Sequence, residues 1–309
     1  MPFSSLRSLV HAAPEVTYGT APAFAAAQTF VAEDFKVMPM EGETQERNPH
    51  QVMLSRQRKK IGPRYCKVEF KVALVRRLGA DTPAPYRAAL LAAGFAETVV
   101  AATSVTYSPV STGFGSMALL YNKDGQVRTV RGIRGGVGLE FTKTGVPYLK
   151  FEGFGLYQGR TSAAFTATDY VPWGEPDLVN QANTQFTLGG FALALEKLDV
   201  GVNNIFGYVN RPNQEGIVPQ KPRDYSGNVT ILDETRAFFN PEALMIAETP
   251  VIIDLQHGTG AGGRARLLAN TAFIETVSEG DVSGEASLDM TLGLNAPLGT
   301  NSDWSLTLS

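Results

Sequence analysis

One glycine pattern in the sequence has the spacing of a dinucleotide-binding turn. Gly258, Gly260 and Gly263 follow an apolar run as G-x-G-x-x-G, and Glu279 lies near the distance expected of a ribose-binding acid. That chemistry needs a long helix and a second parallel strand after the glycines, so that phosphate meets a helix N-terminus. The residues after Gly263 instead alternate as antiparallel strands do, and we expect a β-hairpin tip at this position.

Metal-dependent and hydrolytic chemistry lack their usual residues. The three histidines, His11, His50 and His257, lie in separate segments without the spacing of metal ligands. The sequence has no G-x-S-x-G, C-x-x-C or H-E-x-x-H motif, and its one cysteine, Cys66, allows no intrachain disulfide. We therefore expect no enzymatic activity, no cofactor and no metal.

The connection over residues 41–63 is strongly charged and shows no apolar alternation. Its acidic residues come first, namely Glu41, Glu43 and Glu46. A basic run follows, namely Arg56, Arg58, Lys59 and Lys60, with Arg64 just beyond the connection. A nucleic-acid site would interleave aromatic residues, which are absent, and the net charge of -3 gives no general attraction to nucleic acid. Acidic and basic stretches of one loop can meet their opposites on another copy of the chain, so we expect docking between subunits, with a solvated hairpin as the alternative.

The stretch VRTVRGIRGGVGLEF (127–141) reads as a strand with glycine on one face. One phase of its alternation carries Thr129 and apolar residues, and the other carries Gly132, Gly136 and Gly138. A glycine face either bends sharply or lets another backbone come close. No helix follows to supply the converging N–H groups of a phosphate loop. The pattern predicts a close-packed strand.

Strands must position these segments, because period-2 alternation dominates the chain. Residues 66–74 and 284–294 alternate apolar with polar side chains, and 225–232 does so more weakly. Helix signals are short: an alanine- and leucine-rich run over 81–94 follows Asp-Thr, and 241–248 starts with proline after asparagine. The sequence predicts a mainly β protein with one short helix in each half.

The order of these elements repeats. An extended segment, a long polar connection, a strand and a helix occur over 30–94 and again over 186–248. EFTKTG (140–145) and ETVSEG (275–280) each run from glutamate to glycine before a strand, although any β-rich chain can produce such a coincidence. The expected parts are an N-terminal arm (1–29), a first β domain (30–157), a linker (158–185) and a second β domain (186–309).

Three stretches of the first half carry a recognisable pattern. They are PEVTYGTAPAF (14–24), YRAALLAAGFAETVVAATSVTYSPVS (86–111) and YNKDGQVRTVRGIRGGVGLEFTKTGVPYLKFEGFGLY (121–157). Together they resemble the tail tube proteins of long-tailed bacteriophages. The resemblance implies a tail-tube-type β-sandwich or barrel flanked by a short helix, and the repeated order of elements predicts two such domains in tandem. It also implies strands that join neighbouring subunits into a β-lined ring and a long loop that reaches the next ring.

The same resemblance implies a structural virion protein, assembled in the host cytoplasm, whose stacked rings conduct DNA. Its expected partners are further copies of the chain, the tape-measure protein, and tail-terminator or distal tail proteins, with DNA passing transiently and no membrane. Two tube domains per chain predict trimeric rings with pseudo-six-fold symmetry, and one domain with an appendage predicts hexamers. The candidates for an acidic channel lining that repels DNA are Glu140, Glu152, Glu285 and Asp289.

A secreted or surface-located β-sandwich binding module, for carbohydrate or adhesion, is the alternative function. Such a module would favour a signal peptide and aromatic residues clustered on one face. The N-terminal residues make a poor signal peptide, and the two tryptophans, Trp173 and Trp304, lie far apart in the sequence. The tail tube interpretation is therefore favoured.

Overall fold

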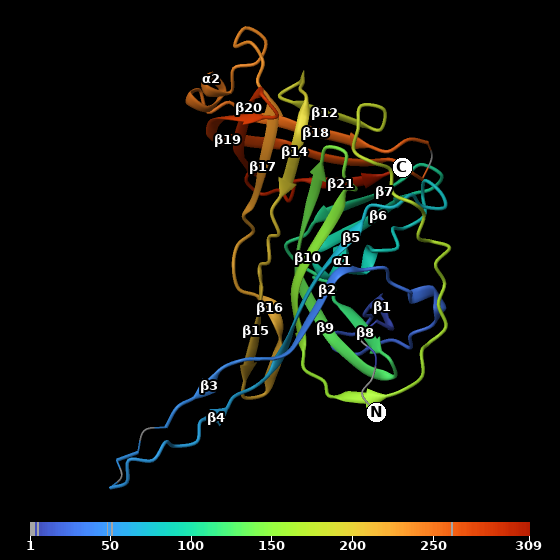
Figure 1. Ribbon diagram of the computed structural model, residues 1–309, viewed down its shortest axis with the longest axis vertical. Coiled ribbons are helices and arrows are strands. Elements are labelled where there is room, and N and C mark those ends of the chain that lie inside the picture. The colour runs from blue at the N-terminus through green and yellow to red at the C-terminus, as the bar shows by residue number, and fades with distance from the viewer. Residues whose placement is uncertain (1–3, 5, 48, 51, 261) are drawn as a thin grey trace.

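The structure is a computed structural model that describes residues 4, 6–47, 49–50, 52–260 and 262–309. Strands dominate the described residues, which confirms the predicted mainly β fold (Figure 1). The first half contains β1 (Ser8–Pro14), η1 (Ala26–Gln28), β2 (Glu33–Glu41), β3 (Thr44–Gln45), β4 (Lys60–Ile61), β5 (Tyr65–Ala73), α1 (Arg87–Ala92), β6 (Phe95–Val100), β7 (Ser104–Pro109), β8 (Met117–Lys123), β9 (Gln126–Thr142), β10 (Tyr148–Leu156) and β11 (Arg160–Ser162). The second half contains β12 (Thr184–Leu188), β13 (Phe191–Ala192), β14 (Leu195–Val200), β15 (Phe206–Arg211), β16 (Gln214–Pro219), β17 (Tyr225–Leu232), α2 (Pro241–Ile246), β18 (Val251–His257), β19 (Ala265–Val282), β20 (Glu285–Leu294) and β21 (Ser305–Leu308).

The strands of the two halves pair in the same order. In the first half the order is β2-β5-β10-β9-β8-β1, with every pair antiparallel. In the second half it is β14-β17-β20-β19-β18-β12, again antiparallel throughout. The halves join where β14 pairs with the C-terminal end of β9, with Leu198 opposite Phe141. One sheet therefore continues from the first half into the second.

A second joint uses the C-terminal strand. β21 pairs with β19, where Leu306 lies opposite Leu267, and with β7, where Leu306 lies opposite Tyr107. Just before β21, the buried Trp304 packs its ring against Phe95 of the first half. Apolar residues of both halves accordingly belong to one core.

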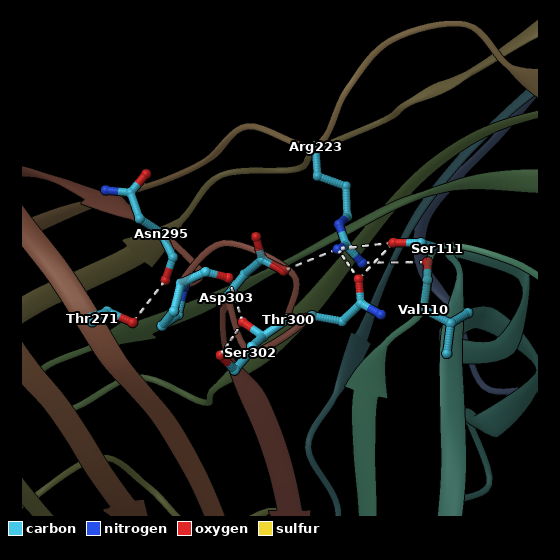
Figure 2. Close-up of polar contacts among 10 residues, drawn as sticks. Val110, Ser111, Arg223, Thr271, Asn295, Thr300, Ser302 and Asp303 are labelled. Carbon is cyan, nitrogen blue, oxygen red and sulfur yellow. Dashed lines mark hydrogen bonds and ion pairs between the residues drawn. The ribbon is translucent and has the colours of Figure 1, made fainter.

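Arg223 strengthens this second joint (Figure 2). Its guanidinium donates to the side chain of Asn301 at 2.6 Å and to the carbonyl of Val110 at 3.3 Å, and it lies 3.3 Å from the carboxylate of Asp303. Arg223 precedes β17 of the second half, whereas Val110 follows β7 of the first. The mostly buried ion pair therefore helps to hold the root of β17 against both the C-terminal segment and the first half.

Gly132 interrupts the alternation predicted for the long strand β9, which holds from Ile133 onward but not before Gly132. Its φ is 58°, a left-handed conformation that favours glycine, and the β8–β9 register slips around it. Ile133 pairs with Met117, but Val130, three residues earlier on β9, pairs with Leu119, only two residues later on β8. Val130 is therefore buried, and the expectation that Thr129 would lie on the apolar face was wrong.

The repeat predicted one extended segment over residues 186–200, but the structure does not form one. Two glycines with positive φ, Gly189 (60°) and Gly190 (87°), turn the chain between β12 and β13 before β14 begins. The linker expected over 158–185 also contributes to packing, because Trp173 stacks edge-on against Phe30 and its Nε1 donates to the carbonyl of Thr29 at 3.0 Å.

The helices and the glycine hairpin follow local sequence signals to different degrees. α2 begins at Pro241 after Asn240, whose side chain accepts a hydrogen bond from the Ala243 N–H at 3.1 Å, as predicted. α1 begins only at Arg87, well after the expected Asp-Thr start. Residues 258–263 connect the antiparallel strands β18 and β19, which confirms the predicted hairpin tip, although residue 261 lies outside the described residues.

Candidate functional site

The joined sheet has one face on the core and one polar face. On β5, side chains alternate between buried and half-exposed, and the half-exposed ones include Lys67, Glu69 and Lys71. The neighbouring β10 alternates in the same way and places Lys150 and Glu152 on the same side. We call this side, over β2, β5, β10, β9, β14, β17 and β20, the polar face.

Two lysines of the polar face each bridge two carboxylates. Lys67 Nζ lies 2.8 Å from Glu69 and 2.9 Å from Glu152, and Lys150 Nζ lies 3.2 Å from Glu140. Hydrogen bonds to Glu69 and Glu152 raise the pKa of Lys67 above its usual value. These ammonium groups are thus already engaged by protein carboxylates and are poorly placed to hold a phosphate.

Lys150 also connects the two halves. It stands on β10, and its Nζ lies 2.9 Å from Asp199 on β14 as well as near Glu140 on β9. Burial lowers the pKa of Lys150, but the hydrogen bonds to Asp199 and Glu140 outweigh it and leave the pKa raised. The charge network of the polar face therefore runs across the joint between β9 and β14.

The four acidic residues predicted for a channel lie in different settings. Glu140 and Glu152 lie on the polar face of neighbouring strands, four register positions apart, and Lys150 occupies a position between them. Asp289 lies on β20, farther along the same face, and accepts a hydrogen bond from the Thr230 hydroxyl at 2.5 Å. Glu285 is exposed at the start of β20, beside the hairpin turn, so the structure does not bring it to the other three.

The glycines of β9 are approached by backbone of the same chain. A side chain at Gly136 would overlap the carbonyl oxygen of Asn203, and one at Gly138 would overlap the carbonyl oxygen of Val200. Val200 is the last residue of β14, and Asn203 lies in the connection from β14 to β15. Gly132 differs, because a Cβ there would meet the ring of Tyr18 at 3.0 Å.

The β15–β16 hairpin is held against the first half by one arginine and one tyrosine. The Arg134 guanidinium donates to the carbonyls of Phe114 (2.9 Å), Gly115 (3.0 Å) and Ile217 of β16 (2.9 Å), and it lies 4.5 Å above the ring of Tyr18. The Tyr18 hydroxyl accepts a hydrogen bond from the Ile217 N–H at 2.6 Å. Both the donor and the acceptor of one β16 residue are therefore fixed by the first half.

Glu15 fixes the segments that carry Tyr18 and Arg134. Its carboxylate accepts hydrogen bonds from the Gly19 N–H (2.8 Å), the Gly132 N–H (2.8 Å) and the Ser116 hydroxyl (2.6 Å). We call Glu15, Tyr18 and Arg134 the hairpin anchor. The sequence patterns drew attention to the stretches that contain these residues but assigned them no role. The one available signal was a charged arginine among the glycines of a strand.

A comparison with known protein families assigns the chain to one of them. Residues 5–296 match the family described as phage tail tube protein. The chain belongs to this family. A comparison with curated proteins found no match. The resemblance to tail tube proteins is thus confirmed, and the chain belongs with structural components of the virion tail rather than with an enzyme family.

The charged connection predicted over 41–63 forms a projecting hairpin in this tail tube protein. β3 and β4 extend away from the body, at the end of the molecule where the β15–β16 hairpin also lies (Figure 1). Glu46 and Lys59 form an ion pair between the two legs, and the Arg64 guanidinium donates to the carbonyl of Gly42 at 2.7 Å. Near the tip, Met53 and Leu54 are exposed to solvent. We call this hairpin the arm.

The structure places the predicted arm residues on this one projection. Glu41 ends β2, Glu43 lies just before β3, and Arg56 and Arg58 lie on the leg that returns to β4. Residues 48 and 51 lie outside the described part of the arm. Across the described residues, no group of histidine, cysteine, aspartate and glutamate side chains could hold a metal ion, and no helix is long and apolar enough to span a membrane.

Proposed function

We propose that three copies of this chain close into a ring with pseudo-six-fold symmetry, and that stacked rings form a tail tube that conducts DNA. The observation that carries this proposal is the shared strand order of the two halves, together with their joint through β9 and β14. If each half is one tube domain, three chains supply six domains, and head-to-tail contacts between unlike halves can close the ring. A chain with one tube domain and an appendage would instead form hexamers.

The polar face is the proposed lining of the channel. DNA passing through a tube should not be held by its phosphates, because each released counterion would add salt-dependent affinity. On this face, Lys67 and Lys150 are bridged by carboxylates, and Lys71 lies 3.4 Å from Asp34. Such a lining presents few free cations to a sliding duplex. Contacts with tape-measure, tail-terminator and distal tail proteins in the virion, and assembly in the host cytoplasm, belong to the same proposal.

Ring composition gives the direct test. We expect native mass measurement of isolated rings to give three copies of the chain, and end-on electron micrographs to show six similar lobes around a central hole. Six copies per ring would contradict the duplicated-domain proposal. Monomers that never form rings or tubes, even at high concentration, would contradict the tube function itself.

The arm is the proposed contact between rings. Its apolar tip and basic leg are exposed, and little of its own body holds it, so its favourable contacts must come from another subunit. We expect the double change Arg58→Glu and Lys60→Glu to leave the melting temperature almost unchanged while shortening or abolishing tubes in electron micrographs. Lys59 is left in place because it pairs with Glu46.

The matched control keeps the charge and changes the side chains. The variant Arg58→Lys with Lys60→Arg should form tubes of normal length, because long-range attraction depends on charge. Normal tubes from the Glu variant would show that the basic leg of the arm does not join rings.

A further inference from the structure

The joined sheet has open strand edges, among them those of β2 and of the C-terminal end of β19. Within the described residues, β2 pairs only with β5, and residues 278–282 of β19 pair only with β20. Residues 278–281 are exposed, and Met40 on β2 is 55% exposed. An open strand edge presents unpaired N–H and C=O groups, so it is a surface on which another strand can pair.

The internal joint indicates which strand fits each open edge. β14 has the place in the second half that β2 has in the first, and β19 has the place of β9. β14 pairs antiparallel with the C-terminal end of β9. A strand in the position of β2 therefore fits the C-terminal end of a strand in the position of β19, and because these two edges belong to one chain, the partner must be a second copy.

The register follows from matching rows of paired residues across the two halves. The rows are Val37–Val68–Gly153–Gly135 in the first half and Leu198–Val229–Met290–Val277 in the second. An irregularity at matching positions supports the match. One extra residue interrupts β9 between Arg131 and Arg134, and one extra residue interrupts β19 between Ile274 and Thr276. This match puts Val282, rather than Glu275 of the ETVSEG stretch, in the place of Glu140.

We infer that β2 of one copy pairs with the C-terminal end of β19 of the next copy, with Met38 opposite Val282. This register is that of the internal joint, in which Asp199 lies opposite Glu140. Met38 follows Val37 as Asp199 follows Leu198, and Val282 lies as far beyond Val277 as Glu140 lies beyond Gly135. The inference rests on the proposed function, because it assumes that copies of the chain form a ring.

Side-chain chemistry at the two edges agrees with this pairing. Met38 and Val282 are both half-exposed and apolar, although their counterparts at the internal joint are charged. Burying them against each other removes apolar surface from water on a face that is otherwise polar. Pro39 takes the place of Val200 and has no N–H group, so this joint offers one donor fewer than the internal one.

Small residues also recur where the internal joint needs them. Gly280 and Ser278 of β19 correspond to Gly138 and Gly136 of β9, past which the backbone after β14 runs. Both Gly280 and Ser278 are exposed in the single chain. The root of the arm, which continues from β2 as that backbone continues from β14, fits beside them.

Disulfide cross-linking in assembled tubes tests the register. We use a Cys66→Ala background and the double variant Met38→Cys with Val282→Cys. On mild oxidation we expect covalent dimers and trimers in non-reducing gels, formed at least about tenfold faster than by Met38→Cys with Gly280→Cys, because residues two positions out of register lie about 7–8 Å apart instead of about 5 Å. The pair Asp199→Cys with Glu140→Cys should cross-link within one chain and is the positive control.

The outcomes separate the register from the function. Faster cross-linking of the Gly280 pair, or no intermolecular cross-link in well-formed tubes whose intrachain control reacts, would overturn the register while leaving the tube intact. Electron microscopy of wild-type tubes gives a second readout that needs no variant, namely which residue of the neighbouring chain lies opposite Met38. A residue other than Val282 overturns the inference, and a protein that forms no rings at all contradicts the proposed function.

Discussion

Replacing Gly136 with valine should lower the free energy of unfolding by about 3 kcal/mol and prevent tube formation. Any side chain at this position overlaps the Asn203 carbonyl oxygen, which is backbone and cannot swing aside as a flexible side chain could. Inserting bulk into a close-packed site typically costs about 1–3 kcal/mol, and the upper end applies because the obstructing atom is fixed by the β9–β14 joint. Urea unfolding of the subunit measures the change in stability, and electron microscopy measures assembly.

Gly159 provides the matched control for this substitution. It follows β10, and a side chain there would meet nothing within 4 Å. Gly159→Val should therefore unfold within about 0.5 kcal/mol of wild type, as surface substitutions usually do. A Gly136→Val protein with wild-type stability would mean that the backbone after β14 does not lie against β9.

Local patterns predicted the parts of the fold that depend on neighbours in the sequence. The alternation over 66–74 predicted β5 because each residue of a half-buried strand faces either the core or the polar side. The start of α2 was predictable because Asn240 caps a helix that begins with proline, and both effects act within one turn. The phase of β9 was predicted correctly from Ile133 onward but not before Gly132, because the one-residue shift at this left-handed glycine puts Val130 rather than Thr129 on the buried face.

The parts of the candidate site that depend on contacts between distant segments could not be predicted from the sequence. The glycines at 136 and 138 signalled that some backbone could come close, but the segment that does so, near Asn203, is defined only once β14 has paired with β9. The role of Lys150 depended on Glu140 and Asp199 reaching it from two other strands. A sequence pattern shows which side chains share a face of one strand, but it does not show which strand lies next to it.

Replacing Arg134 with methionine should release the β15–β16 hairpin and lower the free energy of unfolding by about 3 kcal/mol. Methionine keeps much of the packing volume but leaves the carbonyls of Phe114, Gly115 and Ile217 without their charged donor. A hydrogen bond to a charged group contributes about 1.5–3 kcal/mol, and the total stays below the sum of three because water can reach the freed hairpin carbonyl. Arg134→Lys should recover little of the loss, because an ammonium group cannot reproduce the planar fork of donors.

Hydrogen exchange distinguishes loss of this anchor from a general loss of stability. In the Arg134→Met protein, amides over 206–219 should exchange much faster while those of β5 and β10 remain protected, because the hairpin touches the first half chiefly through the anchor and a small apolar cluster. Arg211→Met is the control, since Arg211 is exposed at the tip of the same hairpin, and its exchange should match wild type. Uniformly faster exchange across both halves in Arg134→Met would contradict a local anchoring role. Since the backbone next to Gly136 leads directly into this hairpin, its release should also weaken tube assembly.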